Sequence, residues 1–393
     1  MQEEVVIVAA KRSAIGSFLG TLKDCSALDL ATQVAQAVIK ESGINKTQID
    51  SLILGQVLQG ACGQNIARRV LMNCEIGTQK CAYLVNIVCG SGLEAVRQAY
   101  NDIILGESQV VLAGGVENMS QAPFYLKNMR IGAKMGHQEA LDSLLYDGLW
   151  CEMSGTHMGI TAENLAQQYK ITREEQDEFA YNSHKKANTA IANGAFKNEI
   201  HPLIIKNKKS EIIFDEDEFV RKDIDLANLA KLRPAFKGDG SVTAGNSSGI
   251  NDGAAILLLA SKTKAQELNL PILASIKGFA KVGVDPKIMG IGAAMAAKKV
   301  LEKCKLSLTD IDLIEANEAF AAQSIASIKE LGVNAENINV NGGAISLGHP
   351  LGCSGARILT TLVHAMKNRG KNLGLATLCI GGGQGIAAIV ESK

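Results

Sequence analysis

Cys89 is the residue of this sequence best placed for nucleophilic chemistry. It follows an apolar run and opens the segment Cys89-Gly90-Ser91-Gly92, after which apolar residues recur at helical spacing. A cysteine just before a helix is reactive because backbone N–H groups and the helix dipole favour its thiolate. We therefore expect Cys89 to act as a covalent nucleophile, although a buried cysteine at a strand end is the commoner arrangement.

His349 is the matching candidate for a base. It lies in the glycine-rich segment Gly348-His349-Pro350, again just before a stretch with helical spacing. A neutral imidazole beside a cysteine can take the thiol proton and so activate the nucleophile. A lone histidine in a loop is usually only solvated, and residue type alone predicts no role for the other five histidines.

Two further segments place polar groups where apolar runs end. Cys379 precedes Gly381-Gly382-Gly383, and Asn317 and Glu318 follow the run that ends at Ile314. Ligands of α/β proteins bind at the carboxyl ends of strands. We expect Cys379 to act as an acid or base and the backbone N–H groups after it to form an oxyanion hole. We expect Asn317 to hold a water or a substrate oxygen and Glu318 to orient His349.

Other chemistries fit the sequence less well. The segment 245–249 matches the serine-hydrolase pattern G-x-S-x-G, but that pattern needs a helix after the serine, and the run 254–260 is typical of a strand. The segments 290–292 and 381–385 both fail the dinucleotide pattern G-x-G-x-x-G. A binding protein without catalytic activity is conceivable, but it would not need two thiols and a histidine in glycine loops.

The elements that must position these residues repeat along the chain. The run 49–53 recurs at 311–314, and Ser91-Gly92 recurs as Ser354-Gly355 at almost the same offset. In both copies a helical stretch ends near a glycine and leads into an apolar run that also ends in glycines. The repeat predicts two similar halves, so that Cys89 opens a helix of one half while His349 and Cys379 flank the matching helix of the other.

Alternating strands and helices predict an α/β layer structure with a mostly parallel sheet in each half. We assign residues 1–118 plus 250–269 to the N-terminal half, 119–249 to an insertion and 270–393 to the C-terminal half. Within the insertion, Thr172 and Glu175 predict a capping box that starts a helix. Insertions on rigid scaffolds often carry substrate contacts.

Composition excludes several classes of protein. Lys plus Arg and Asp plus Glu both number 40, so a nucleic-acid-binding or polybasic membrane surface is not expected. No stretch is long and apolar enough for a membrane helix. The nine cysteines include no C-x-x-C pair, which argues against a zinc site, and their odd number without a secretion signal favours free thiols in the cytoplasm.

Taken together, four segments resemble the signatures of the thiolase family, and they occur in that family's order. They are Cys89-Gly90-Ser91-Gly92, Asn317-Glu318-Ala319-Phe320, Gly348-His349-Pro350 and Cys379-Ile380-Gly381-Gly382-Gly383. The resemblance implies a five-layer αβαβα fold with an inserted loop domain that binds coenzyme A. It also implies that Cys89 is acylated, that His349 activates it and that Cys379 moves the α-proton.

The resemblance extends to finer roles. Asn317, through a held water, and His349 would stabilise an enolate oxygen, and the N–H groups of Cys89 and Gly381 would stabilise the oxyanion of the acyl-enzyme step. The residues that match the family's substrate and coenzyme A contacts are Leu149, His157, Met158, Arg221, Phe236, Ala244, Ser248, Met289, Ala319 and Phe320. Asn228, where relatives often have serine, departs from the pattern near the nucleotide.

The implied reaction is the ping-pong condensation of two acetyl-CoA molecules to acetoacetyl-CoA and CoA, and its reverse. Met158 and Met289 resemble residues that narrow the acyl pocket of short-chain members. The thioester is the substrate, and no further cofactor is implied. Residues 121–136 correspond to the family's tetramerisation loop, so we expect a homotetramer. Two thiols in one pocket also raise the hypothesis of a reversible Cys89–Cys379 disulfide.

Overall fold

Strands β1 (Val5–Arg12) and β13 (Ala274–Gly283) pair antiparallel at the middle of one ten-stranded sheet. The computed structural model describes residues 3–207 and 210–393. Outward from β1 the strands are β12 (Asn251–Ser261), β5 (Val110–Asn118), β3 (Ser51–Gly55) and β4 (Cys81–Val85), and β2 (Gly16–Ser17) also pairs with β12. Outward from β13 they are β16 (Gln384–Ser392), β15 (Leu373–Ile380) and β14 (Leu313–Ala316). Repeated segments therefore occupy matching places on the two sides.

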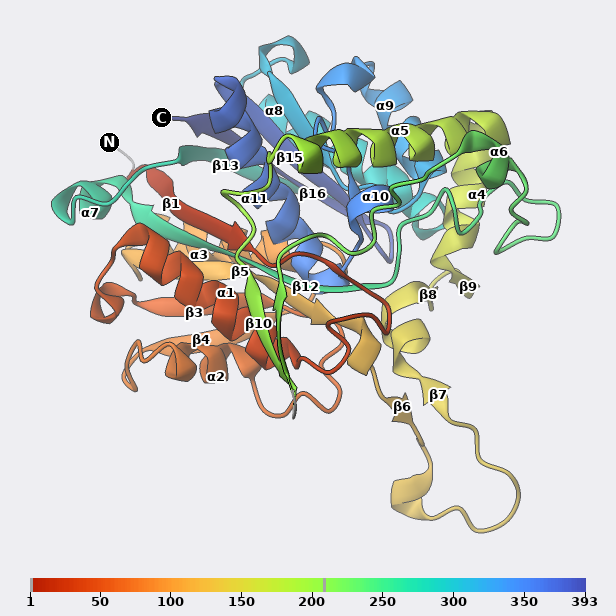
Figure 1. Ribbon diagram of the computed structural model, residues 1–393, viewed down its shortest axis with the longest axis horizontal. Helices are drawn as coiled ribbons and strands as arrows, with labels where there is room; N and C mark the ends of the chain where they lie inside the picture. The colour runs from red at the N-terminus through yellow and green to blue at the C-terminus, as the bar shows by residue number, and fades with distance from the viewer. Residues whose placement is uncertain (1–2, 208–209) are drawn as a thin grey trace.

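The helices form three layers around the two halves of the sheet (Figure 1). Helices α3 (Ser91–Ile104) and α11 (Leu351–Arg369) pack against each other and against strands of both halves. One outer face carries α1 (Ala27–Ser42) and α2 (Ile66–Asn73), and the other carries α8 (Gly292–Cys304) and α9 (Ala321–Leu331). The expected five-layer αβαβα class is confirmed.

The layers explain why the strands read as continuous apolar runs. In β1, Val5 and Ile7 belong to the buried cluster that includes α3 and α11, whereas Val6 and Val8 belong to the cluster that includes α1 and α2. Successive side chains of a strand point to opposite faces, and here both faces are covered by helices. A strand covered in this way is apolar at most of its positions, which removes the usual alternation.

The expectation of a mostly parallel sheet is wrong. Strand β3 is parallel to β4 and β5, and β14 is parallel to β15, but β12 and β16 run antiparallel to their neighbours. The turn between β15 and β16 explains one of these strands. Gly382 and Gly383 there have φ of 85° and 86°, which glycine adopts without strain, so the chain reverses in a tight hairpin.

The segment between β5 and β12 packs mainly over the C-terminal half. Helix α4 (Met158–Gln168) contacts α9, and α5 (Arg173–Ala192) contacts α9 and α10 (Ala344–Leu347). The predicted capping box of Thr172 and Glu175 is confirmed at the start of α5. The smaller elements are β6 (Phe124–Tyr125), β7 (Leu141–Asp142), β8 (Trp150–Cys151), β9 (Thr156–His157), β10 (Leu203–Asn207), β11 (Ser210–Phe214), α6 (Leu226–Ala230) and α7 (Lys262–Glu267).

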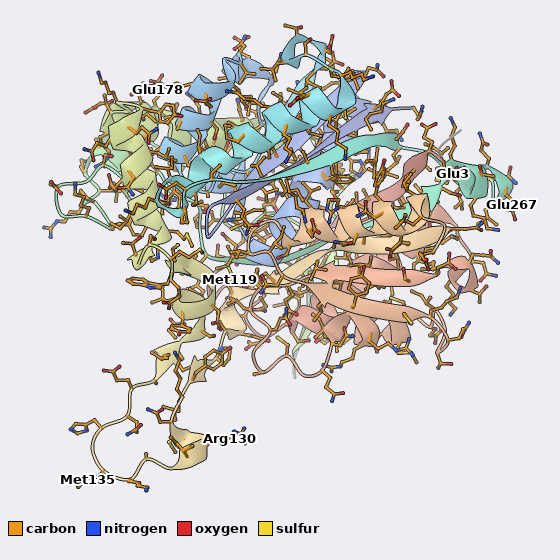
Figure 2. The ribbon with its side chains drawn as sticks, turned by 180° about the vertical axis from the view of Figure 1, so that it is seen from behind. Glu3, Met119, Arg130, Met135, Glu178 and Glu267 are labelled. Carbon is orange, nitrogen blue, oxygen red and sulfur yellow. The ribbon has the colours of Figure 1, made fainter. Side chains whose placement is uncertain are left out.

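A long loop between β6 and β7 projects away from the body of the molecule. Figure 2 shows Arg130 and Met135 near its far end, well separated from the sheet. Its apolar side chains are open to solvent, with Ile131 81% and Met135 95% exposed. Among residues 3–207 and 210–393, no helix has the length and apolar character needed to cross a membrane.

Candidate active site

Cys89 sits on a tight turn that links β4 to α3. The residue before it, Val88, has a φ of 53°, which is unusual for a β-branched side chain and costs about 1–3 kcal/mol. Two side chains hold this backbone in place. Asn86 Oδ1 accepts from the Val88 N–H at 2.9 Å, and Ser91 Oγ donates to the Val88 carbonyl at 2.6 Å. The strained turn therefore fixes where the thiol of Cys89 points.

The thiol of Cys89 keeps its proton at neutral pH in the ligand-free protein. It is 8% exposed, and burial raises its pKa to about 11, although the N–H groups of Gly381 and of Cys89 itself oppose the rise. The backbone N–H groups do favour the thiolate, as predicted, but burial has the larger effect and keeps the thiol protonated in the ligand-free site. Cys89 needs a base when it attacks.

His349 has the protonation state that such a base needs. Its Nδ1 lies 2.5 Å from Ser354 Oγ, and the Ser354 hydroxyl donates to the Pro350 carbonyl at 2.9 Å. A hydroxyl has one hydrogen, so a Ser354 that donates to the Pro350 carbonyl accepts from Nδ1–H, and this tautomer leaves the lone pair on Nε2. Burial, and then the charge of Arg357, lower the pKa of His349 to about 3, so its imidazole is neutral at physiological pH.

Sequence reasoning missed Ser354 as a functional residue. It noted Ser354 only as the repeat counterpart of Ser91, which itself supports the turn before Cys89. The signal for its role was the repeat itself. A serine occupies the same place in both copies, beside the candidate nucleophile in one copy and the candidate base in the other.

Replacing Ser354 with alanine is expected to lower kcat by about 10- to 100-fold with little change in KM, because the tautomer and orientation of His349 are then no longer fixed. Steady-state kinetics of the variant measure this split. Thr360→Ala is the matched control, since Thr360 is a buried hydroxyl on the same helix that makes no hydrogen bond within the described residues. A kcat for Ser354→Ala within twofold of wild type would contradict the role.

Asn317 lies beside His349 at the end of β14. Its Nδ2 is 3.4 Å from Nδ1 and 3.5 Å from Nε2 of the imidazole. Its Oδ1 is buried and accepts no hydrogen bond from the described residues. A buried amide oxygen is seldom left without a donor, so this atom is available to a water or to a substrate.

Glu318 does not orient His349, contrary to the sequence-based expectation. Its carboxylate accepts from Ser183 Oγ at 2.7 Å, from Asn339 Nδ2 at 2.7 Å and from the Ile345 N–H at 3.2 Å. These partners lie on α5, on the loop before α10 and on α10 itself. Consecutive side chains leaving a strand point to opposite sides, so Asn317 takes the place beside the histidine and Glu318 faces away.

Cys379 lies at the end of β15, next to Cys89. It is 1% exposed, and burial raises its pKa well above the ordinary range, with a further rise from the nearby Cys89. Both thiols are free cysteines. A Cβ added at Gly381 would lie 2.8 Å from Met158 Cε and 3.3 Å from Val88 Cγ1, so a larger residue there has to displace the end of Met158 beside the N–H that reaches Cys89.

A buried glutamate ties the two halves together near the nucleophile. Glu117, on β5, accepts backbone N–H bonds from Val57 and Leu58 at 3.0 Å and from Gly352 at 2.8 Å. Gly352 lies in the first turn of α11, just after His349. Burial raises the pKa of Glu117 to about 7. Sequence reasoning missed this residue, although a glutamate within a strand that is apolar on both faces was a signal.

The pKa of Glu117 predicts a pH-dependent stability. Between the ordinary value of 4.5 and about 7, the folded protein keeps a proton that the unfolded chain has released, so wild type loses stability as pH rises through this window. Glu117→Gln cannot titrate. We expect this variant to be the less stable protein at pH 5, with the difference in Tm from wild type shrinking by pH 8; a constant difference would contradict the assignment.

Three rings among the predicted ligand contacts pack against one another near Cys379. The ring of His157 stacks on Phe236 at 4.7 Å, and Phe236 meets Phe320 edge-on at 6.0 Å. Phe320 belongs to one buried cluster with Cys379, and the other predicted contacts in that cluster are Met158, Met289 and Ala319. Leu149 packs on the cluster that contains Cys89. Met158, Met289, Ala319 and Phe320 therefore lie close to Cys379, whereas Leu149 lies on the side of Cys89.

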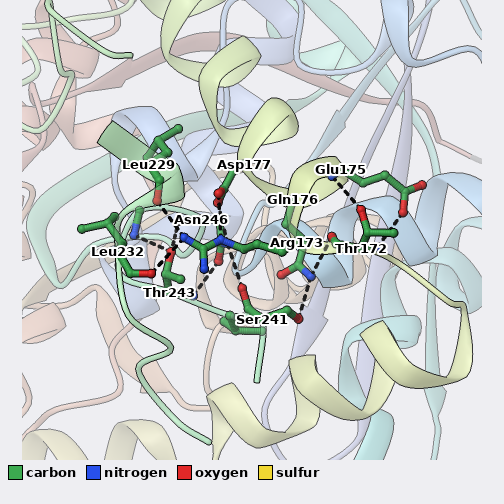
Figure 3. A network of polar contacts seen from close by, with 12 residues as sticks. Thr172, Arg173, Glu175, Gln176, Asp177, Leu229, Leu232, Ser241, Thr243 and Asn246 are labelled. Atoms are coloured by element: carbon green, nitrogen blue, oxygen red, sulfur yellow. Dashed lines mark hydrogen bonds and ion pairs between the residues drawn. The ribbon is translucent and has the colours of Figure 1, made fainter. Parts of the chain in front are cut away.

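The loop that carries Ala244 and Ser248 is anchored by α5, as Figure 3 shows. Asn246 Nδ2 donates to Asp177 Oδ1 at 2.9 Å, and Gln176 Nε2 donates to Ser241 Oγ at 2.8 Å. Outside this network, the Ser248 N–H donates to the Ala319 carbonyl at 3.0 Å. These bonds fix the loop beside the segment that ends in Phe320.

Arg221 lies at the surface and contacts none of the candidate catalytic residues in the described structure. Its backbone N–H donates to His184 Nδ1 at 3.1 Å, and its carbonyl accepts from Asn188 Nδ2 at 2.9 Å. Its guanidinium is exposed, 6.0 Å from the ring of Phe219. A ligand that contacts both Arg221 and the rings of His157, Phe236 and Phe320 has to extend to the protein surface.

Comparison with known proteins gives a consistent result. The family models described as thiolase N-terminal domain and thiolase C-terminal domain match residues 5–263 and 270–392. A probable acetyl-CoA acyltransferase of Staphylococcus aureus strain COL is 53% identical over 388 residues, which cover 98% of each chain. An acetyl-CoA acetyltransferase of Bacillus anthracis superposes with a TM-score of 0.98 at 47% identity, covering 100% of this chain and 99% of that one. Human mitochondrial 3-ketoacyl-CoA thiolase superposes with a TM-score of 0.97 at 42% identity over all of both chains.

Proposed function

This chain is an acyltransferase of the thiolase family, and from that premise we propose that it condenses two acetyl-CoA molecules to acetoacetyl-CoA and CoA and catalyses the reverse thiolysis. The observation that carries this choice of substrate is the position of Met158. Its Cε reaches the backbone of Gly381, and Met158 shares a buried cluster with Met289 and Cys379. An acyl chain longer than acetyl or acetoacetyl has to displace these side chains.

The first half-reaction transfers an acetyl group to Cys89. As the thiol attacks the thioester carbonyl, His349 Nε2 takes its proton, and the N–H groups of Cys89 and Gly381 stabilise the oxyanion. The C–S bond to coenzyme A then breaks, and the departing sulfur takes the proton of Cys379. The products are acetyl-Cys89, free CoA and a pair of opposite charges, imidazolium and thiolate. The attraction between these opposite charges offsets part of the cost of charging two buried groups.

The second half-reaction forms the carbon–carbon bond. The Cys379 thiolate removes an α-proton from a second acetyl-CoA, and its raised pKa suits it to this weakly acidic proton. The enolate oxygen accepts hydrogen bonds from protonated His349 and from a water held by Asn317. The carbanion attacks acetyl-Cys89, acetoacetyl-CoA forms, and the released Cys89 thiolate regains its proton from His349. Every step uses the chain's own groups and the two thioesters.

We further propose that residues 119–249 form an inserted loop domain that binds coenzyme A. The insertion lies between 1–118 and 250–269, which together form the N-terminal half, and residues 270–393 form the C-terminal half. The pantetheine arm would follow His157, Phe236 and Phe320, whose rings lie in contact. Leu149, Ala244 and Ser248 would line the same path. Arg221, exposed at the surface, would meet the nucleotide end of the ligand.

Chain length is the sharpest test of the substrate. Wild type is expected to cleave acetoacetyl-CoA with a kcat/KM at least about 100-fold above that for 3-ketooctanoyl-CoA, because the longer acyl chain meets Met158. Met158→Ala should raise kcat/KM for the longer substrate by about 10-fold and leave acetoacetyl-CoA cleavage near its wild-type rate. Steady-state thiolysis assays with both substrates give these numbers.

Met72→Ala, at an exposed methionine of α2, is the control and should change neither value. Equal kcat/KM for both substrates in wild type would contradict the short-chain assignment. It would favour a 3-ketoacyl-CoA thiolase of broader range, the activity named for the human mitochondrial relative.

We also propose that the protein forms a homotetramer through residues 121–136. This segment lies in the projecting loop, where exposed apolar side chains gather, and a second copy of the chain would cover them (Figure 2). Light scattering should give four times the subunit mass for wild type and a smaller multiple for Ile131→Asp. An unchanged mass for the variant would contradict a role for this loop.

A further inference from the structure

A large cleft lies outside the path that leads to the thiols. It has a volume of about 920 Å³ and lies between α5, the loop 335–341 and the end of α11. We call it the α5 cleft, and it is lined by α5 residues at helical spacing that include Phe179, Ser183, Lys186 and Ala190. The residues of α5 that hold Asn246 and the backbone of Arg221, which are Asp177, His184 and Asn188, lie on another face of the helix. The cleft is therefore a separate feature.

Three cations border the α5 cleft. Lys185, Lys186 and Arg369 form no ion pair with any of the described residues. Lys186 is half-buried, and its Nζ donates to the Ile338 carbonyl at 2.8 Å. Arg369 donates to Asn341 Oδ1 at 3.2 Å with one of its five N–H groups. Several charged donors thus remain available in a recess, an arrangement that favours an anion.

The other lining groups define what kind of anion fits. Side-chain amides add neutral donors and acceptors around the cleft: Asn182, Asn193, Asn198, Asn341 and Asn368. Phe179, Ile328 and Val340 provide apolar contact area. Two carboxylates also line it, but Glu318 is buried and already accepts three hydrogen bonds, and Glu336 is exposed. The surroundings therefore suit a small molecule with an acidic group and an apolar body.

The α5 cleft is bordered by residues that adjoin the candidate catalytic residues in sequence or through hydrogen bonds. Glu318 directly follows Asn317, and its partner Ser183 lies 3.0 Å from Ser346 Oγ, three residues before His349. A ligand that contacts Lys186 and Ser183 would change the support of both catalytic side chains. From this geometry we propose that the α5 cleft is an effector site for a small organic anion, a carboxylate or phosphate with an apolar body, whose occupancy changes kcat.

Phenyl phosphate, benzoate and the neutral benzyl alcohol are suitable probes, with saturation-transfer NMR as the measurement. The enzyme is first saturated with CoA, so that the anion site of the thioester path is filled. At least one of the two anions should bind wild type, and the alcohol should not. Comparing the anions shows whether the site prefers phosphate or carboxylate. This test does not depend on the proposed acetyl transfer.

The double substitution Lys185→Gln/Arg369→Gln should weaken anion binding at least about 10-fold. Both side chains are exposed, so the fold should survive, and an unchanged Tm verifies this. Lys277→Gln/Lys299→Gln removes the same charge from exposed positions elsewhere and should leave binding unchanged. The bound anion should also change kcat of wild type by at least twofold and leave kcat of the double variant unchanged. Absence of binding to wild type, equal binding to the double variant, or binding without any change in kcat would overturn the proposal.

Discussion

Replacing Cys89 with alanine is expected to reduce acetyl transfer by about 10⁴-fold or more, because removal of a covalent nucleophile removes the path through the acyl-enzyme. The fold should tolerate the change, since the turn is held by Asn86 and Ser91 rather than by the thiol. The rate of acetoacetyl-CoA thiolysis at saturating CoA measures the loss. Residual activity would come from substrate binding and the oxyanion hole alone.

Cys353→Ala is the matched control for this experiment. Cys353 is a buried cysteine in the same apolar cluster as Cys89, on helix α11, and no catalytic step uses it. Its substitution should leave the rate within about twofold of wild type, because it removes only a small buried side chain. If Cys89→Ala kept more than a tenth of the wild-type rate while Cys353→Ala behaved normally, the nucleophile would have to be another group.

Cys379→Ala is expected to separate the two half-reactions. This variant should still release one CoA per active site from acetyl-CoA, because His349 can supply a proton to the leaving sulfur. Condensation should fall by about 10³-fold or more, since no base remains to take the α-proton. Rapid-quench measurement of CoA and acetoacetyl-CoA in the same samples gives both quantities.

Hydrogen exchange provides a second readout for Cys379. In heavy water, wild type should replace the methyl protons of acetyl-CoA with deuterium, and NMR follows the loss of the proton signal. The Cys379→Ala enzyme should leave these protons in place even after it is acetylated. Full exchange in the variant would assign the α-proton to a different base, and loss of the CoA burst would mean that Cys379 is needed before condensation.

Much of this fold could be predicted from the sequence because the chain is duplicated. Matching segments around Ser91 and Ser354 indicated two equivalent helices, and these helices pack together between the halves as α3 and α11. The direction of β12 could not be read in the same way. It pairs with β5 across more than a hundred residues of intervening chain, and apolar runs look alike whether their neighbours are parallel or antiparallel.

Electrostatics of the site were the least predictable part. The glycines and the helix start around Cys89 predict a thiolate. The charge of Cys89 is decided by its burial, however, and burial depends on residues far along the chain such as Met158 and Ile380. The same burial keeps His349 neutral and raises the pKa of Cys379. A sequence motif can name the reactive groups, but it does not report how much water reaches them.

The residues that position the catalytic side chains could not be predicted from the sequence either. Glu318 seemed suited to orient His349 from its position in the motif, whereas Ser354 and Asn317 occupy the places beside the imidazole. Side-chain direction at a strand end decides between adjacent residues, and it follows from register rather than from residue type. Glu117 was missed for a related reason, because its three backbone partners come from separate segments that meet only in the folded protein.

Locating the acetyl group on the enzyme tests the central claim most directly. Wild type is mixed with acetyl-CoA, quenched in acid, digested and mapped by mass spectrometry. We predict one acetyl group per subunit, on the peptide that contains Cys89 and bound to its sulfur, and its disappearance when CoA is added before the quench. An acetyl group on Cys379 or on another residue, or an unmodified Cys89 in an enzyme that is turning over, would contradict the proposed mechanism.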